Sequence, residues 1–207
     1  MPKYILHYFG VNGRGAVPRA ILTYAKVDWK NDIIQRDEWP KIKKSDLCEF
    51  EFLPVLEVDG KKYCESLAVN IYLAEKFNLM GKTPEDNYQI YNLLTTFDDF
   101  NVQFRPFRLC ADETKKPELK QKAIDRLKFF ISKFEKRYVD LGKGKYFLGD
   151  KFTLADIYLG VALLGFCQTV NEYPFKEVGP NLGELIERLK QNELKEFHEK
   201  YYFKLIK

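Results

Sequence analysis

The sequence predicts a small mixed α/β domain followed by an all-helical domain. In the first third of the 207 residues, the spacing of apolar residues changes repeatedly between that of a strand and that of a helix. The segment NLMGKTPEDN then interrupts both patterns with Gly81 and Pro84, as a connection between domains does. Only helical patterns follow this segment. We therefore expect the order β-α-β-α-β-β-α within residues 1–81 and helices within residues 83–207.

Local signals place the elements of the first domain. In order, we expect a strand over 3–8, a helix over 16–26, a strand in WKNDII and two strands in LPVLEVDGKKYCES. Pro18 is acceptable because it falls in the first turn of its helix. Asp59-Gly60 between two short extended runs is a strong hairpin signal. The helix SLAVNIYLAEKF follows, and Ser66 is its expected N-cap.

The second domain is expected to contain helices only. The helical patterns cover residues 85–111, 115–141, 153–170, 181–191 and 193–201. Thr153 precedes the third of these helices, and Asp156 occupies its third position. The two side chains can therefore cap each other's backbone amides, which is a structural role.

Composition and charge exclude several functional classes. The 34 basic and 30 acidic residues are interleaved, which indicates a mixed surface and not a nucleic-acid-binding stripe. No apolar run is long enough to span a membrane, and the chain starts without an export signal. The four cysteines are scattered, without metal-site spacing. We expect a cytoplasmic protein with reduced thiols that uses no metal and binds neither nucleic acid nor membrane.

The stretch YILHYFGVNGRG is the first candidate site. Its glycines, Gly10, Gly13 and Gly15, have the spacing GxxGxG, which matches neither a dinucleotide fingerprint nor a phosphate loop, so they are interpreted as a turn. Tyr8 ends the first strand, at the rim where ligands bind to α/β sheets. Its hydroxyl can donate to an anion, and Arg14 adds a fixed positive charge. Packing is the alternative for Tyr8, since the chain has 13 tyrosines.

Two further segments match parts of a peptide ligand. If the Leu53–Pro54 bond is cis, the free edge at the following strand can pair with a peptide as an added strand; the alternative is a plain strand entry. At the start of the next helix, Ser66 and backbone amides suit a carboxylate, and Glu65 suits an ammonium group. Together they would hold an amino-acid head group, although Ser66 alone is only a cap.

Taken together, these segments resemble the cytosolic glutathione S-transferases, most of all the sigma class, which includes glutathione-dependent prostaglandin D synthases. The resemblance is carried, in order, by YILHYFGVNGRGAVPRAIL, EWPKIKK, LPVLEVDGKKYCESLAVNIYLAEKF, TTFDDF and FTLADIYL, and it covers essentially the whole chain. It implies a thioredoxin-like glutathione-binding domain at 1–81, a helical domain at 83–207 that carries most of the electrophile pocket, and a homodimer. Glutathione is then the co-substrate.

The resemblance also assigns roles to individual residues. Tyr8 donates a hydrogen bond to the glutathione sulfur and stabilises the thiolate, which is the nucleophile. Arg14 supports that charge. Trp39 and Lys43 hold the glycyl carboxylate, and Leu53 pairs with the cysteinyl backbone.

The remaining implied contacts concern the other end of glutathione. Ser66 binds the γ-glutamyl carboxylate, and Glu65 meets the amine together with Asp98 of the partner subunit. Phe52 and the cis-proline Pro54 complete the glutathione-binding set. For the electrophile pocket, position in the chain indicates Phe9, Phe104, Arg105, Phe107 and the C-terminal YYFKLIK. Such an aromatic wall suits small hydrophobic electrophiles.

Several positions depart from the family pattern. Glu65 stands where the sigma class usually has Gln, and Ala16 replaces an acidic residue near Arg14. Glu51 and Phe52 occupy a longer loop where a polar glutathione contact is expected, so affinity for glutathione is expected to be lower. The segment NVQFRPF lacks the Trp found in the prostaglandin-isomerising enzymes.

Three functions follow from the sequence. The first is conjugation of glutathione to small electrophiles. The second is a glutathione-dependent prostaglandin or lipid isomerase or a peroxidase, and the third is a non-catalytic, crystallin-like relative.

Overall fold

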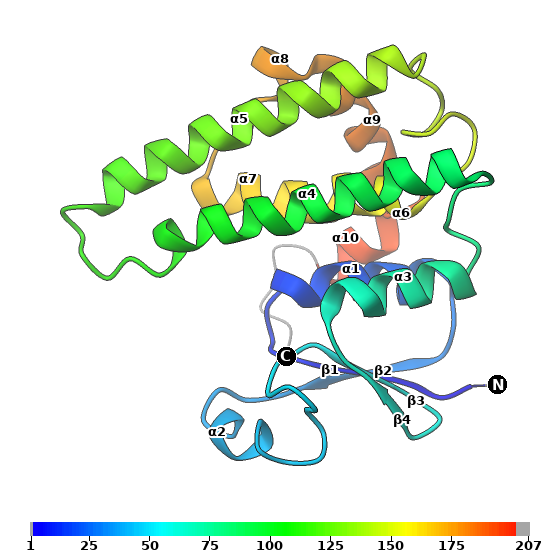
Figure 1. Cartoon of the computed structure of the whole chain (residues 1–207), viewed down its shortest axis with the longest axis vertical. Coiled ribbons are helices and arrows are strands. Elements are labelled where there is room, and N and C mark those ends of the chain that lie inside the picture. The colour runs from blue at the N-terminus through cyan, green and yellow to red at the C-terminus, as the bar shows by residue number, and fades with distance from the viewer. Residues whose placement is uncertain (1, 202–207) are drawn as a thin grey trace. The chain divides into compact units, whose positions relative to one another are not determined.

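The computed structural model describes residues 2–201, which form two compact units (Figure 1). One unit contains the chain up to Leu79 together with the segment that starts at Leu189, and the other contains Met80–Arg188. The segment that starts at Leu189 contributes buried apolar side chains, since Leu194 and Phe197 are each only 1% exposed.

The first unit is built on a four-stranded mixed sheet. Its strands are β1 (Tyr4–Tyr8), β2 (Trp29–Ile33), β3 (Val55–Val58) and β4 (Lys61–Tyr63). Their order is β2-β1-β3-β4, with β2 parallel to β1 and with β3 antiparallel to both β1 and β4 (Figure 1). The predicted hairpin is confirmed, with Asp59 and Gly60 both at positive φ between β3 and β4. This is the predicted thioredoxin-like arrangement.

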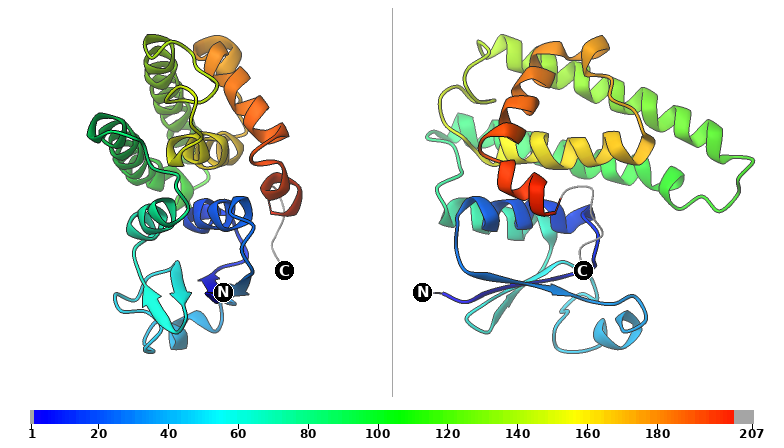
Figure 2. Two further views of the ribbon diagram at one scale, coloured as in Figure 1. Left: turned by 90° about the vertical axis from the view of Figure 1, so that its right-hand side faces the viewer. Right: turned by 180° about the vertical axis from the view of Figure 1, so that it is seen from behind.

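The first unit also contains helical elements, some of which cover one face of the sheet (Figures 1 and 2). The helical elements of the first unit are a 3₁₀ turn, η1 (Gly13–Gly15), then α1 (Ala16–Tyr24), α2 (Trp39–Ile42), α3 (Ser66–Lys76) and α10 (Lys195–Lys200). α1 and α3 lie side by side on the sheet, and α10 packs on α1 (Figures 1 and 2). The sheet-facing core contains Leu6, Leu56, Ile21 and Leu73, which are fully buried.

The second unit is entirely helical among its described residues. It contains α4 (Pro84–Arg108), α5 (Lys116–Asp140), α6 (Leu154–Ile157), a π-helical stretch η2 (Tyr158–Leu163), α7 (Leu164–Val170) and α8 (Phe175–Val178), and α9 (Pro180–Gln191) begins in it. Phenylalanine rings of α4, α5 and α7 form its core: Phe97, Phe100, Phe104, Phe130, Phe134 and Phe166. Within residues 2–201, no helix is long and apolar enough to cross a membrane.

A buried carboxylate fixes the entry to α6. Asp156 is fully buried, and its Oδ2 accepts hydrogen bonds from the backbone N–H of Thr153 at 2.8 Å and from the Thr153 hydroxyl at 3.0 Å. Its Oδ1 accepts a third, from the backbone N–H of Phe147 at 2.8 Å. The predicted capping box is therefore confirmed, and it also anchors the preceding loop.

Three expectations about the helices need correction. Ser66 is not an N-cap: Glu65 holds that position with φ 66° and ψ 110°, and Ser66 is the first helical residue. The helix expected over 153–170 contains the π-helical stretch η2. The helix α8 was not predicted, because four residues are too few to show a period.

Candidate functional site

Tyr8 lies at the carboxyl end of β1, with its hydroxyl held by the following turn. The side chain is buried, and the backbone N–H of Arg14 donates a hydrogen bond to Tyr8 Oη at 3.0 Å. A phenol that accepts a hydrogen bond in this way retains its own proton for donation to another acceptor. Because hydrogen bonds in a chain strengthen one another, this contact makes the phenol a stronger donor to its own acceptor.

The glycines of the turn make room for Tyr8. A Cβ atom at Gly13, which has φ +38°, would lie 2.7 Å from Tyr8 Oη. At Gly15, a Cβ atom would lie 2.4 Å from Cδ1 of the same ring. Side chains at these positions would therefore displace the phenol. The glycines let the backbone of the turn approach Tyr8 closely, which agrees with their interpretation as a turn.

Arg14 connects Tyr8 to the start of α3. Its Nη1 donates a hydrogen bond to Ser66 Oγ at 2.9 Å, and Ser66 is buried. Glu65, next to Ser66, is exposed and adopts a backbone conformation that side-chain-bearing residues rarely occupy. Such strain concentrates at ligand-binding positions. The structure thus joins three predicted site residues, Tyr8, Arg14 and Ser66, in one set.

The Leu53–Pro54 peptide bond is cis, as expected. It immediately precedes β3, whose first residue, Val55, is paired with His7 of β1. Leu53 and Pro54 therefore lie at the same end of the sheet as Tyr8. Pro54 is buried and Leu53 is half-buried.

Trp39 and Phe9 form an aromatic pair beside Tyr8. The ring centroid of Phe9 lies 5.6 Å from that of Trp39, edge to face, and 5.6 Å from that of Tyr8. The guanidinium carbon of Arg36 lies 5.1 Å from the Phe9 centroid. Phe9, expected on the electrophile side, and Trp39, expected on the glutathione side, are thus direct neighbours.

Lys43 has an internal partner that a ligand carboxylate would have to displace or share. Its Nζ lies 3.7 Å from Oε2 of Glu51, and both side chains are partly exposed. Phe52, next to Glu51, exposes 66% of its surface. The departure from the family pattern at Glu51 and Phe52 therefore places an acidic group directly at the lysine expected to bind the glycyl carboxylate.

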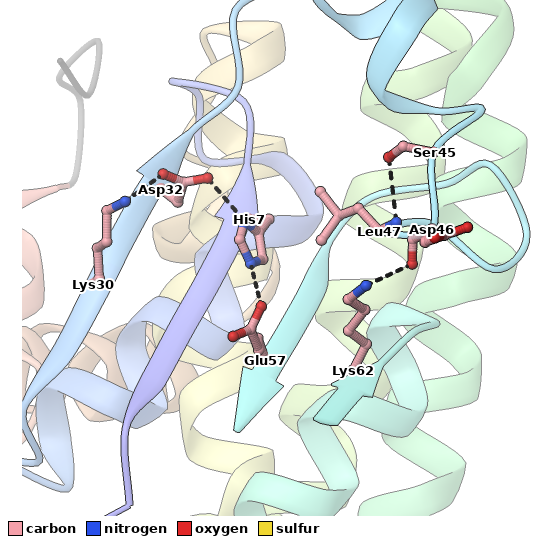
Figure 3. Close-up of polar contacts among 8 residues, drawn as sticks. All are labelled: His7, Lys30, Asp32, Ser45, Asp46, Leu47, Glu57 and Lys62. Carbon is pink, nitrogen blue, oxygen red and sulfur yellow. Dashed lines mark hydrogen bonds and ion pairs between the residues drawn. The ribbon is translucent and has the colours of Figure 1, made fainter. Parts of the chain in front are cut away.

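Polar contacts hold the sheet and the loop after α2 in place (Figure 3). Lys62 Nζ on β4 donates to the backbone oxygen of Asp46 at 2.8 Å, which ties that loop to the sheet (Figure 3). Across three strands, His7 Nδ1 lies 2.8 Å from Asp32 Oδ2, and His7 Nε2 lies 3.5 Å from Glu57 Oε2. Burial opposes ionisation of Asp32, but hydrogen bonds from Lys30 and His7 outweigh it and hold the pKa of Asp32 below its usual value.

The remaining predicted site residues belong to α4, in the second unit. Asp98 is half-buried, whereas Asp99 and Arg105 are exposed. Phe104 is fully buried, and Phe107 packs edge to face against it with centroids 5.8 Å apart. The C-terminal YYFKLIK, expected in the electrophile pocket, lies outside the described residues except for Tyr201. Within residues 2–201, no group of three or more His, Cys, Asp or Glu side chains is arranged to hold a metal ion.

Sequence reasoning missed Arg19, which lies behind Tyr8. Its side chain is 0% exposed, and its guanidinium carbon lies 5.4 Å from the Tyr8 ring centroid. The available signal was an arginine inside the apolar segment AVPRAIL, on a helix whose first eight residues are all buried. A charged residue in such a segment requires polar partners, which the sequence alone does not identify.

If Lys43 binds the glycyl carboxylate of glutathione, as the resemblance implies, replacing Glu51 by glutamine is expected to strengthen that binding. The change removes the anion beside Lys43 with little change in size, so the KM for glutathione should fall about two- to threefold. Glu49→Gln, at an exposed carboxylate in the same loop, is the matched control and should leave KM unchanged. A KM that stays constant or rises in Glu51→Gln would show that Glu51 does not compete at this position.

The chain is similar to known proteins in both sequence and fold. Residues 98–200 match the family model described as the C-terminal domain of glutathione S-transferase. The chain is 32% identical to glutathione S-transferase 1 of Ascaris suum over 84% of each chain, and 33% identical to haematopoietic prostaglandin D synthase of Gallus gallus over 78% of each. A crystal structure of a monomeric glutathione S-transferase from the hookworm Necator americanus superposes with a TM-score of 0.84 at 29% identity, covering 95% of this chain and 96% of that one.

These relatives extend over most of the chain and share both of its parts, the mixed sheet with its helices and the helical unit. The chain belongs to the glutathione S-transferase family, on its sigma-like branch.

Proposed function

We propose that this protein conjugates glutathione to small hydrophobic electrophiles, with Tyr8 as the residue that stabilises the glutathione thiolate. The hydrogen bond from the Arg14 N–H to Tyr8 Oη carries the proposal, because it orients the phenol as a donor. A free thiol has a pKa of about 8.5, so a donor directed at the sulfur increases the thiolate fraction at neutral pH.

The reaction follows from this arrangement. The thiol of glutathione loses its proton to solvent, and the thiolate accepts the Tyr8 hydrogen bond. The sulfur lone pair then forms a bond to the electrophilic carbon. With an aryl chloride, the electron pair of the carbon–chlorine bond leaves as chloride. Tyr8 remains protonated throughout and therefore acts as a hydrogen-bond donor, not as a base.

The other site residues are proposed to hold the tripeptide in extended form. Leu53, ahead of the cis-proline, pairs with the cysteinyl backbone as an added strand would. Ser66, beside Arg14, takes the γ-glutamyl carboxylate, and Glu65 takes the amine. Trp39 and Lys43 meet the glycyl end. Phe9, Arg105 and Phe107 are proposed to contact the electrophile, with Phe104 supporting Phe107 from the core.

The proposal includes a homodimer, in which Asp98 of the partner subunit reaches the γ-glutamyl amine. The hookworm relative is described as monomeric, so assembly varies in this family and has to be measured for this chain. Solution mass by light scattering should give twice the mass of one 24.5 kDa chain. A stable monomer with full activity would remove the role of Asp98.

Two assays test the function. Purified protein should be retained on immobilised glutathione and should conjugate a chlorinated dinitrobenzene. If the protein shows no retention and no turnover at millimolar glutathione, the result would support a non-catalytic relative, the alternative to which Glu51 and Phe52 lend support. A prostaglandin endoperoxide and a lipid hydroperoxide belong in the same panel, because prostaglandin D synthases are among the relatives of this chain. Turnover of these substrates alone would favour an isomerase or a peroxidase.

A further inference from the structure

Arg19 is a buried cation that, within the described part of the chain, donates hydrogen bonds to neutral oxygens only. Within residues 2–201, Nη1 donates to the carbonyl of Val11 at 2.6 Å, Nη2 to the carbonyl of Phe9 at 2.9 Å, and Nε to Asn31 Oδ1 at 3.0 Å. A buried charge without a carboxylate partner is costly, and a hydrophobic residue of similar size would avoid that cost. Packing alone therefore does not explain why an arginine occupies this buried position.

The contacts of Arg19 fix the backbone that leads from Tyr8 to the amide of Arg14. Phe9 and Val11 lie in the short segment between the strand and the turn, and the guanidinium links both of their carbonyls to β2 through Asn31. The packing is close, since a Cβ atom at Gly15 would lie 2.9 Å from Arg19 Nη1 as well as against the Tyr8 ring. The position of the N–H that bonds Tyr8 Oη thus depends on Arg19.

The guanidinium also remains charged at neutral pH. Burial lowers the pKa of Arg19 to about 10, and this effect is opposed by the phenols of Tyr8 and Tyr201. These two groups face it from β1 and from the end of α10; Glu196 and Lys200 of α10 act on Tyr201 in turn. The guanidinium carbon lies 5.4 Å from the Tyr8 ring centroid, so this positive charge lies close to the place where an anion bound by Tyr8 would lie.

We propose that Arg19 is a positioning residue for Tyr8: it holds the turn that orients the phenol, and it supplies the buried positive charge that favours a thiolate there. This inference rests on the proposed function, because it requires a sulfur anion at Tyr8. It differs from the role of Arg14, whose exposed side chain contacts Ser66.

Arg19→Met tests the proposal by removing the charge while keeping much of the volume. The readout is the apparent pKa of the glutathione thiol bound to the protein, taken from thiolate ultraviolet absorbance and from the pH profile of kcat/KM. We expect this pKa to rise by about one unit, which lowers kcat/KM about tenfold at neutral pH. Arg19→Lys, which keeps the charge but not the fork of donors, should restore most of the thiol pKa and only part of kcat.

Arg36→Met is the matched control. Its guanidinium carbon lies 5.1 Å from the Phe9 ring, a similar distance from an aromatic ring, but the side chain is exposed, so the thiol pKa should not change. If Arg19→Met does not fold, Arg19→Gln, which retains a donor to a carbonyl, replaces it. An unchanged thiol pKa in the folded Arg19 variant, with only a lower free energy of unfolding, would overturn the proposal.

Tyr8→Phe distinguishes a failure of the role proposed for Arg19 from a failure of the thiolate site at Tyr8. If Tyr8→Phe raises the thiol pKa and the charge-removing Arg19 variant does not, only the role of Arg19 fails. If neither variant changes it, the thiolate site at Tyr8 fails together with the inference drawn from it.

Discussion

Replacing Tyr8 by phenylalanine is expected to lower kcat about 100-fold while the KM for glutathione changes less than about twofold. The change removes only the hydroxyl, which is directed at the sulfur by the Arg14 N–H at 3.0 Å. The groups proposed to hold the ends of the tripeptide stay in place. Because the lost contact is strongest when the sulfur is an anion, the loss falls on turnover. Steady-state kinetics with a chlorinated dinitrobenzene at varied glutathione gives both constants.

Tyr4→Phe is the control for this substitution. Tyr4 lies on the same strand, its side chain is also buried, and it contacts Phe77 and Lys76 instead of the turn. Its kcat should remain within about twofold of the unsubstituted protein. Unchanged turnover in Tyr8→Phe would transfer the role of sulfur-directed donor to Arg14 or to another group.

The second large effect is expected on stability, at Asp156. Asp156→Ala leaves the N–H groups of Phe147 and Thr153 buried without their acceptor, and it should lower the free energy of unfolding by about 3 kcal/mol. Urea denaturation at neutral pH measures this change. The matched control is the second capping box, where Asp86 accepts from the N–H groups of Thr83 and Lys82 at an exposed position. Asp86→Ala should lower the free energy of unfolding by only about 1 kcal/mol. Equal losses in the two variants would show that the burial of Asp156 does not increase the effect.

Asp156 should also make stability depend on pH. Burial raises its pKa from 3.8 to about 6, although hydrogen bonds from Phe147 and Thr153 oppose the shift. The folded state therefore binds the proton more readily than the unfolded state does. The stability that this difference contributes is fully present below pH 3.8 and is lost as the pH rises through about 6. The difference in free energy of unfolding between the protein and Asp156→Asn should decrease over that window. A difference that grows with pH would mean that the three donors hold the carboxylate charged.

The parts of the fold that the sequence predicts well depend on residues close together in the chain. The Thr153–Asp156 box and the Asp59-Gly60 hairpin each lie within four residues, so residue type and spacing determine them. The resemblance assigns Tyr8, Arg14 and Ser66 to one site, and in the structure hydrogen bonds connect these three residues.

What the sequence did not predict depends on partners distant in the chain. In the sequence, Arg19 is an unexplained charge in an apolar helix, because its partner Asn31 lies on the strand β2. The ion pair between Lys43 and Glu51 crosses a loop, and no periodic pattern predicts the two ends of a loop to meet. The shift of the N-cap from Ser66 to Glu65 depends on an unusual backbone conformation that residue type does not favour.

The membership of α10 in the first unit has a consequence for how the protein is made. A ribosome synthesises the sheet well before α10, so the surface of α1 that α10 covers stays open until α10 has been made. The turn after β1 also gains one of its contacts only at that stage, because Asn12 Nδ2 donates to the backbone oxygen of Tyr201 at 3.2 Å. A nascent chain released early would therefore carry the strand with Tyr8 but lack one of the contacts that hold its turn.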